Sequence, residues 1–216
     1  MSDKYKIIGP VYDLLSTIYS GKQIHRCKTA MHEDIKAGDK VLFAGVGHGR
    51  DAVHAAECGA EVTVVDLSAT MLKNFEKNLK GRNFKHPIRT VHSDIMKFAE
   101  VDAYDYVFAN FFLNVFPEGF MVDVMKHLST LVNKNGALVV GDFHFPTGNW
   151  FVRKFQSLYW YIAVLTFTIF AKNAFHEIYN YPKHLESIGF KVEKTKRYNI
   201  FALPCYWSLK ATRQAD

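Results

Sequence analysis

Several features that mark specialised proteins are missing from this 216-residue sequence. Its three cysteines, Cys27, Cys58 and Cys205, form no CxxC or Cys/His pair, and their odd number argues against a disulfide framework. The N-terminus, MSDKYKIIGP, has no apolar stretch of the kind found in signal peptides. Lysine and arginine are spread along the chain without a long basic block, although the net charge is +6. We therefore expect a reduced, cytoplasmic setting and no nucleic-acid partner.

No repeat, low-complexity tract or linker divides the chain, so we expect a single domain over residues 1–216. The hydrophobic fraction of 49% and the charged fraction of 22% are those of an ordinary globular enzyme. Aromatic residues reach 15%, with 18 Phe and 11 Tyr. This excess favours an apolar pocket or surface, although a large core also uses phenylalanine.

One long apolar segment, FQSLYWYIAVLTFTIFA, runs from Phe155 to Ala171 without a charged residue, between Lys154 and Lys172. As a helix it would just reach across a thin hydrocarbon layer. The polar residues within it favour a buried or substrate-covering helix over a helix lying in the membrane interface, and both over a membrane span. We expect residues 147–180 to form a hydrophobic lid or membrane-interface insertion, with any membrane contact through 150–172.

The rest of the sequence alternates between strand and helix patterns. Continuous apolar runs are typical of parallel strands buried on both faces. We expect strands at 40–46, 60–66, 87–94, 104–110 and 137–145, helices at 50–59, 68–81, 120–136 and 181–189, and a closing hairpin over 190–213. Such βα units predict an α/β fold with a mainly parallel sheet and an antiparallel edge.

The motif VLFAGVGHGRD, residues 41–51, places Gly45, Gly47 and Gly49 between the first strand and the first helix. Glycines here let the backbone turn sharply, and the helix N-terminus favours an anionic ligand group. Asp66 closes the next strand, where a carboxylate can accept both hydroxyl groups of a ribose. The spacing is GxGxG and not the GxGxxG of the dinucleotide fingerprint. A nicotinamide dinucleotide and S-adenosylmethionine both remain open on these residues alone.

The segments VVDLSATML (64–72) and HSDI (92–95) resemble the signature segments of class I S-adenosylmethionine-dependent methyltransferases. The similarity is greatest to the small-molecule branch that methylates quinones, lipids and similar acceptors, and runs from about Lys40 to Phe145. It implies a Rossmann-like seven-stranded sheet of order 3-2-1-4-5-7-6 with strand 7 antiparallel and helices on both faces. The product form of the cofactor would be S-adenosylhomocysteine.

The resemblance also implies a set of cofactor-binding residues. The three glycines of the loop would pass under the methionine part, and Asp66 would hold the ribose. Leu67 and Met71 would enclose the adenine, with Asp94 accepting from its amino group and Ile95 beside the ring. Further along, Asn110 and Phe111 would border the methyl group. An N-terminal tyrosine, Tyr19, would cover the cofactor.

The sequence departs from the family at Phe43, where many members have an aspartate or glutamate that helps to hold the methionine ammonium group. Phenylalanine cannot accept a hydrogen bond. We expect backbone carbonyls of the glycine loop, or the side chain of Asn110, to take over this role, so that the cofactor is still bound.

The acceptor side carries no strong catalytic signature. After the fourth strand the chain reads NFFL, residues 110–113, and lacks the prolines of the methyltransferases that modify base or amide nitrogens. Aromatic residues near the N-terminus, after strand four and after strand five suit a hydrophobic small molecule. If the acceptor is a hydroxyl or phenol, His144 and His176 are the candidate general bases. No metal is expected.

We therefore expect methyl transfer to a small, hydrophobic acceptor by in-line displacement, with aromatic lid residues positioning the acceptor. Two alternatives remain. One is a nicotinamide-dependent oxidoreductase, which the SATML segment and the lack of a Tyr-x-x-x-Lys pair disfavour. The other is a non-catalytic member of the same fold that binds cofactor or lipid.

Overall fold

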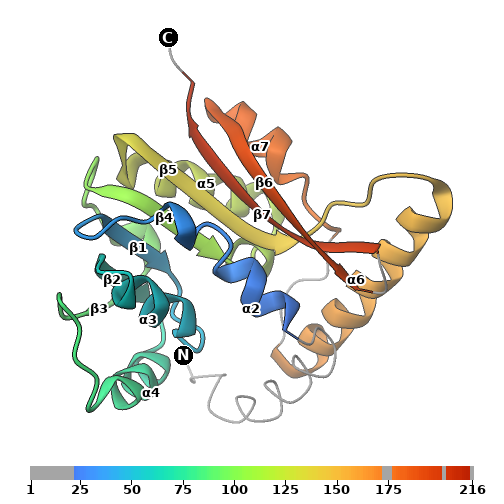
Figure 1. Ribbon diagram of the computed structural model, residues 1–216. Coiled ribbons are helices and arrows are strands. Elements are labelled where there is room, and N and C mark those ends of the chain that lie inside the picture. Colours follow the sequence, from blue (N-terminus) through green and yellow to red (C-terminus); the bar gives the residue numbers. More distant parts are fainter. Residues whose placement is uncertain (1–21, 172–176, 201–202, 215–216) are drawn as a thin grey trace.

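The computed structural model describes residues 22–171, 177–200 and 203–214, with side chains described to residue 162 in the first range. Seven strands form one sheet of order β3-β2-β1-β4-β5-β7-β6 (Figure 1). Six strands run in one direction, and β7 is antiparallel to both of its neighbours. This confirms the predicted strand order. The strands are β1 (Lys40–Ala44), β2 (Glu61–Asp66), β3 (Arg89–His92), β4 (Tyr104–Asn110), β5 (Val132–Phe143), β6 (Phe190–Ile200) and β7 (Leu203–Arg213).

Helices cover both faces of the sheet because the buried strands turn alternate apolar side chains to opposite sides. In β1, Val41 and Phe43 belong to one core cluster, whereas Leu42 and Ala44 belong to the other. The helical elements are α2 (Gln23–Lys28), η2 (His32–Asp34), α3 (Arg50–Glu57), α4 (Ala69–Leu79), η3 (Ile95–Lys97), η4 (Leu113–Val115), α5 (Glu118–Leu131), α6 (Trp150–Ala171) and α7 (Tyr181–Ser187).

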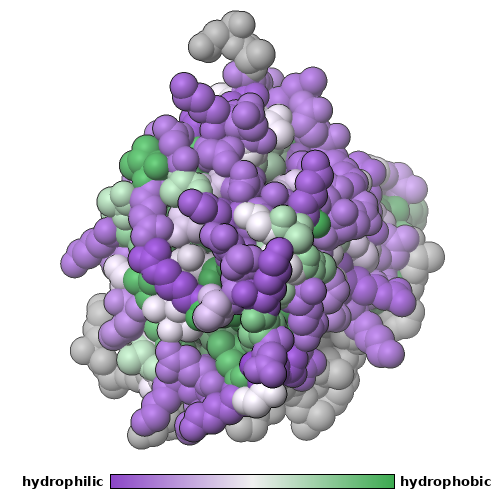
Figure 2. Space-filling model, turned by 60° about the vertical axis from the view of Figure 1, so that its left-hand side comes forward, coloured by the Kyte–Doolittle hydropathy of each residue, from purple (hydrophilic) through white to green (hydrophobic). Residues whose placement is uncertain are grey.

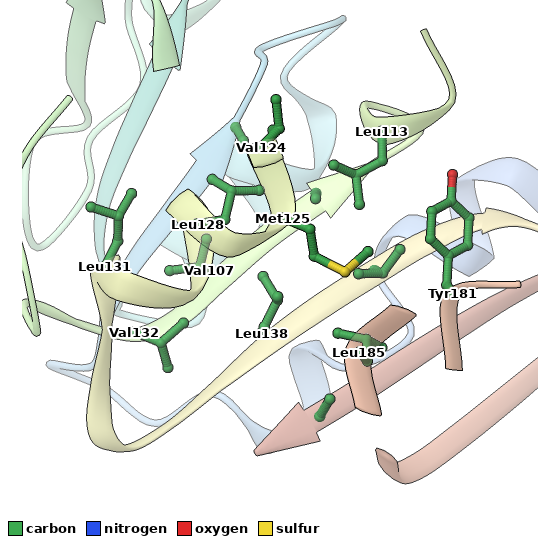
Figure 3. Packing of buried hydrophobic residues seen from close by; sticks show 14 of the residues in the cluster. Val107, Leu113, Val124, Met125, Leu128, Leu131, Val132, Leu138, Tyr181 and Leu185 are labelled. Carbon is green, nitrogen blue, oxygen red and sulfur yellow. The ribbon is translucent and has the colours of Figure 1, made fainter. Parts of the chain in front are cut away.

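The larger core cluster lies between the sheet and helices α5 and α7 (Figure 3). Met125 and Leu128 of α5 and Leu185 of α7 meet Val107 and Leu138 of the central strands, and all five are completely buried. Burying a side chain of this size stabilises the fold by about 1.5–3 kcal/mol. This packing makes the central strands a rigid support for the residues at their carboxyl ends.

Helix α5 ends five residues before the predicted end of its segment, so the prediction of helix 120–136 was wrong at that boundary. The backbone amides of Asp102 and Ala103 donate to the carbonyls of Thr130 and Leu131, at 2.9 and 3.1 Å. These tertiary partners satisfy carbonyls at the end of the helix, and the chain continues directly into β5 at Val132. A local sequence pattern carries no sign of such long-range capping.

Figure 2 shows the molecule from the side of the first strands and their helices, with mostly hydrophilic side chains and small hydrophobic patches between them. Among the described residues, no helix combines the length and the apolar character needed to cross a membrane.

Candidate cofactor site and acceptor site

The glycine loop joins β1 to α3 at the carboxyl end of the sheet. Gly45 and Gly49 both have a positive φ, 80° and 66°, and both are crowded by an aromatic ring. A Cβ atom at position 45 would lie 2.9 Å from the ring of Phe112, and one at position 49 would lie 2.1 Å from the ring of Phe75. Glycine is therefore required at both positions for its backbone angles and for the close approach. The loop is a tight turn whose backbone is open to a ligand at Gly47.

Asp66 lies at the end of β2 and connects the glycine loop to the turn before α4. One carboxylate oxygen accepts from the backbone amide of Val46 and the other from that of Ser68, each at 2.7 Å. A carboxylate has about four acceptor positions, so these two bonds alone do not fill it. The charge is held in place and is half-buried, as a ribose-binding residue requires.

The residues predicted around the adenine lie next to Asp66. Leu67 is 67% exposed, so its side chain is available to cover a flat ring. Met71 is half-buried against the core on one face of the sheet, whereas Ile95 is buried in the core of the other face. Asp94 accepts from the amide of Met96 at 3.0 Å and caps η3. Met71, Asp94 and Ile95 have structural roles in packing or capping, and the contact of all four residues with adenine remains a prediction.

Phe43 is a core residue in this structure and does not line the ligand loop. Its ring is 2% exposed and stacks on Phe108, with 4.9 Å between the ring centroids and 15° between the planes. The edge of His32 completes the contact, at 6.1 Å. The aromatic side chain thus extends the hydrophobic core beneath the loop, where an acid would be buried.

Asn110, at the end of β4, has an unusual hydrogen-bond balance. Its Nδ2 donates to the carbonyl of Lys28 and to the carboxylate of Asp51, both at 3.1 Å. Its Oδ1 is buried without a hydrogen-bond partner and lies 2.5 Å from where a Cβ of Gly141 would be. The two acceptors around Nδ2 fix the orientation of the amide. An unsatisfied buried acceptor at this place fits a ligand that brings a hydrogen-bond donor.

Around this asparagine and the loop lie Phe112, from the NFFL segment, and two residues that the sequence did not point to. Asp51 is a buried carboxylate in the first turn of α3. The Nζ atom of Lys28 lies 3.6 Å from the place of a Cβ on Gly47, where an ammonium group suits a ligand carboxylate. Phe112 covers Gly45. Lys28 is 82 positions from Asn110 and lies outside the quoted motifs, whereas Asp51 is the last residue of VLFAGVGHGRD.

Phe111 follows Asn110 with a φ of 52°, a conformation rare for a non-glycine residue. Its amide donates to the carbonyl of Gly141 at 2.7 Å. The ring makes edge contacts with Phe143 and Tyr206, at 5.8 and 5.7 Å between centroids. The structure places the neighbouring ring of Phe112 against the loop. The contact of Phe111 with the methyl group remains a prediction.

His144 is buried just after β5, and both of its ring nitrogens have partners. Nδ1 lies 2.6 Å from the carbonyl of Phe145, and Nε2 accepts from Arg197 Nε at 3.3 Å. Burial lowers the pKa of His144 below its ordinary value. In this arrangement the imidazole is neutral and engaged, so a role as general base would need one of these bonds to open. His176 and Tyr19 lie outside the described residues.

A second buried acid, Asp142, lies near the end of β5 and was not predicted. Its carboxylate accepts from Tyr181 Oη at 2.7 Å, from Asn114 Nδ2 at 2.8 Å and from the amide of Phe143 at 2.7 Å. Burial, and then the negative charge of Asp142, raise the pKa of Tyr181 well above 10. The pair joins α7 and η4 to the sheet near the carboxyl end of β5.

Helix α6 covers the end of β5 and the start of β7 with one face. Trp160 makes an edge contact of 4.6 Å with Phe143, and the hydroxyl groups of Tyr159 and Tyr206 lie 2.7 Å apart. The opposite face carries Trp150, Phe151 and Leu158, which are 63%, 75% and 61% exposed. The described part of the helix is therefore both a cover over the sheet and an exposed apolar surface.

Comparison with known proteins agrees with this geometry. Residues 41–136 match the family described as methyltransferase domain. The chain is 27% identical to the demethylmenaquinone methyltransferase of Anoxybacillus flavithermus, over 78% of this chain and 73% of that protein. The residues that carry the glycine loop, Asp66 and Asn110 all lie within the matched range.

Two solved structures show the same fold at low sequence identity. The 1,6-didemethyltoxoflavin-N1-methyltransferase of Burkholderia thailandensis, solved with bound 1,6-didemethyltoxoflavin and S-adenosylhomocysteine, has a TM-score of 0.72 at 15% identity, over 98% of this chain and 87% of that one. The magnesium protoporphyrin IX methyltransferase of Synechocystis PCC 6803, with bound S-adenosylhomocysteine, has a TM-score of 0.66 at 18% identity, over 88% and 82%.

Proposed function

Since the chain is a class I S-adenosylmethionine-dependent methyltransferase, we propose that it methylates a small, hydrophobic acceptor such as a quinone, a lipid or an aromatic metabolite. The observation that carries the proposal is the concentration of aromatic rings at the carboxyl ends of β4 and β5. Edge contacts link them into two groups, Phe112, Phe116 and Phe120 in one, and Phe111, Phe143, Trp160 and Tyr206 in the other.

Membership of this family decides against the nicotinamide-dependent oxidoreductase that the glycine spacing had left open. The acceptor class is supported by the demethylmenaquinone methyltransferase among the relatives, whose name indicates a quinone. At 27% identity this relative supports the class of hydrophobic acceptors but does not identify the acceptor of the present chain.

The cofactor supplies a methyl group that is already activated by a positively charged sulfur atom. The protein has to align the acceptor with that carbon and keep water away. We propose that Asp66 holds the ribose, that Lys28 pairs with the carboxylate of the methionine part, and that Asn110 Oδ1 accepts from its ammonium group. Asp51, fixed by Asn110, places a second negative charge beside that position. Asn110 and Asp51 together would take over the role of an acidic side chain at position 43, where this chain has phenylalanine.

The acceptor would lie between the two aromatic groups, where rings exclude water and provide flat surfaces for another ring. No general base is assigned to the described residues in this proposal, because His144 has both nitrogens bonded. An acceptor that is ionised in solution, such as an acidic phenol, needs none.

The direct test measures formation of S-adenosylhomocysteine by the pure protein with a series of acceptors. Demethylated quinones with short apolar tails, supplied in the reduced hydroquinone form so that a nucleophile is present, should be turned over, and polar acceptors that carry the same nucleophilic group should react more slowly. Preference for the polar acceptors, or no turnover with any hydrophobic one, would contradict the proposal.

We also propose that the exposed face of α6 rests on an anionic membrane surface, where a hydrophobic acceptor would be met. Trp150, Phe151 and Leu158 share one side of the helix, at spacings of one, seven and eight residues. Arg153 and Lys154 are exposed between them, and Lys154 Nζ lies 5.9 Å from the Trp150 ring. Aromatic rings beside basic side chains are typical of helices that lie in a membrane interface.

Vesicle flotation tests this contact. The protein should float with vesicles that contain anionic lipid and remain behind with zwitterionic ones, and the double variant Phe151→Ser/Leu158→Ser should lose the binding. Val101→Ser is the matched control, because Val101 is 62% exposed at the opposite end of the sheet. Association of the protein with itself at increasing concentration, without vesicle binding, would show that a second copy covers the face instead.

A further inference from the structure

Gly141 lies inside the buried strand β5, at a place where the backbone conformation does not call for glycine. Its φ is not among the positive values found at the turns of this chain. It pairs with Asn110 of β4 on one side and with Ser208 of β7 on the other. A glycine within a strand weakens the strand, and it often marks a place where another group approaches the backbone closely.

The group that approaches Gly141 is the side-chain amide of Asn110. A Cβ atom at position 141 would lie 2.5 Å from Asn110 Oδ1 and 3.5 Å from Asn110 Cγ. The next contact, with Cys27 Sγ at 3.6 Å, is an ordinary van der Waals distance. The conflict that a side chain would create at this position is therefore with the asparagine amide.

The same amide joins two segments that border the glycine loop. Asn110 Nδ2 donates to the carbonyl of Lys28 at the end of α2 and to the carboxylate of Asp51 in the first turn of α3, both at 3.1 Å. Because Oδ1 is at the far end of a flexible side chain, a Cβ at position 141 would rotate the amide and leave the strand in place. Such a rotation would break both bonds.

We propose that Gly141 is a positioning residue for the cofactor: it gives the Asn110 amide the space to remain between Lys28 and Asp51, where the amino acid end of the cofactor would bind. The inference rests on the proposed role of Asn110 in holding the ammonium group. It adds that this end of the site is controlled from β5, by a residue that offers no side chain of its own.

A double-mutant cycle on cofactor affinity tests the inference. Gly141→Ala should weaken the binding of S-adenosylmethionine and S-adenosylhomocysteine by about tenfold, the effect of one lost hydrogen bond, and should leave 5′-methylthioadenosine unchanged. In the Asn110→Ala protein the amide is gone and the space is free, so adding Gly141→Ala should cause no further loss. Calorimetric titration of the four proteins measures these affinities.

Urea unfolding of the same four proteins without ligand tests the contact itself. Gly141→Ala should lower the free energy of unfolding when Asn110 is present, and the double variant should be as stable as Asn110→Ala alone. This comparison applies even if the single variant folds poorly. Gly119→Ala is the matched control, because a Cβ at that position meets no atom within 4 Å. It should leave the cofactor affinity unchanged.

Full cofactor affinity in Gly141→Ala would overturn the inference, and so would an equal loss with and without the asparagine amide. A double variant that does not fold, although Asn110→Ala does, would show that position 141 conflicts with another group. Full affinity in Asn110→Ala would overturn the proposed role of Asn110 and this inference with it. Failure to methylate hydrophobic acceptors would overturn only the proposed acceptor.

Discussion

The ring of Phe43 lies almost parallel to the ring of Phe108, at 4.9 Å between their centroids, with both side chains buried in the core beneath the glycine loop. Replacing Phe43 by an acid should therefore fail. Phe43→Asp would bury a carboxylate among aromatic rings. Losing a core phenylalanine costs about 3–5 kcal/mol, and the variant should lower the free energy of unfolding by at least that amount. Urea unfolding would measure this loss. Phe43→Leu should cost much less, and an unchanged stability of Phe43→Asp would contradict the packing described.

Asp66 accepts hydrogen bonds from the loop amides of Val46 and Ser68 and, in our proposal, from the ribose hydroxyl groups. Asp66→Ala should weaken cofactor binding by about 1.5–3 kcal/mol for each hydrogen bond lost to the charged acceptor. Asp66→Asn keeps one oxygen and should lose less affinity. Calorimetric titration gives the affinities, and thermal unfolding shows whether the loop contacts to Val46 and Ser68 were also needed for stability. Full affinity in a folded Asp66→Ala protein would place the ribose elsewhere.

The orphan oxygen of Asn110 allows a test that separates the two ends of the cofactor. Asn110→Leu removes the acceptor and should weaken S-adenosylmethionine and S-adenosylhomocysteine alike, by about 1–3 kcal/mol, since both carry the ammonium group. Binding of 5′-methylthioadenosine, which lacks the amino acid end, should not change. Equal losses for all three ligands in a calorimetric titration would mean that the variant disturbs the whole site.

His32 gives the stability a dependence on pH. Burial lowers its pKa from 6.5 to about 4, with Asp51 opposing the shift and His54 and His25 adding to it. A histidine that is harder to protonate when folded stabilises the protein above pH 6.5, and this contribution is lost as the pH falls toward about 4. The maximum is on the order of 3 kcal/mol.

Removing the titratable group tests this prediction. His32→Phe keeps a ring beside Phe43 and Phe108 and should flatten the pH dependence of the unfolding free energy between pH 4 and 6.5. Urea unfolding at several pH values measures it. An identical pH profile in the variant and the wild type would show that other groups dominate.

The sequence predicted most of the fold because its signals are local. The apolar runs at Val41 and Val62, the cap at Ser68 and the glycine loop each act within a few residues. The end of α5 was missed because its cap comes from residues about 28 positions earlier, through the bonds of Asp102 and Ala103. The strand order came from the family resemblance, since patterning alone leaves it undetermined.

The residues of the candidate site also fall into those that local motifs predicted and those that only long-range contacts bring together. Asp66 and the glycines lie in one motif and were found. Lys28 and Asp51 reach Asn110 across 82 and 59 positions of the chain. Nothing near Lys28 in the sequence distinguishes it from a surface residue, and Asp51 ends the glycine motif without any local sign of its contact with Asn110. Only the folded sheet brings them to the carboxyl end of β4.

The place of β7 between β5 and β6 has a consequence for how the protein is made. The ribosome produces β7 after both of its neighbours, yet β7 pairs with both along most of its length. Until residues 203–213 have emerged, β5 has an open edge and β6 has no partner in the sheet. Unpaired edges of this kind invite pairing between chains. The half of the sheet around β1 can form during synthesis, but the complete sheet can form only after β7 has been synthesised.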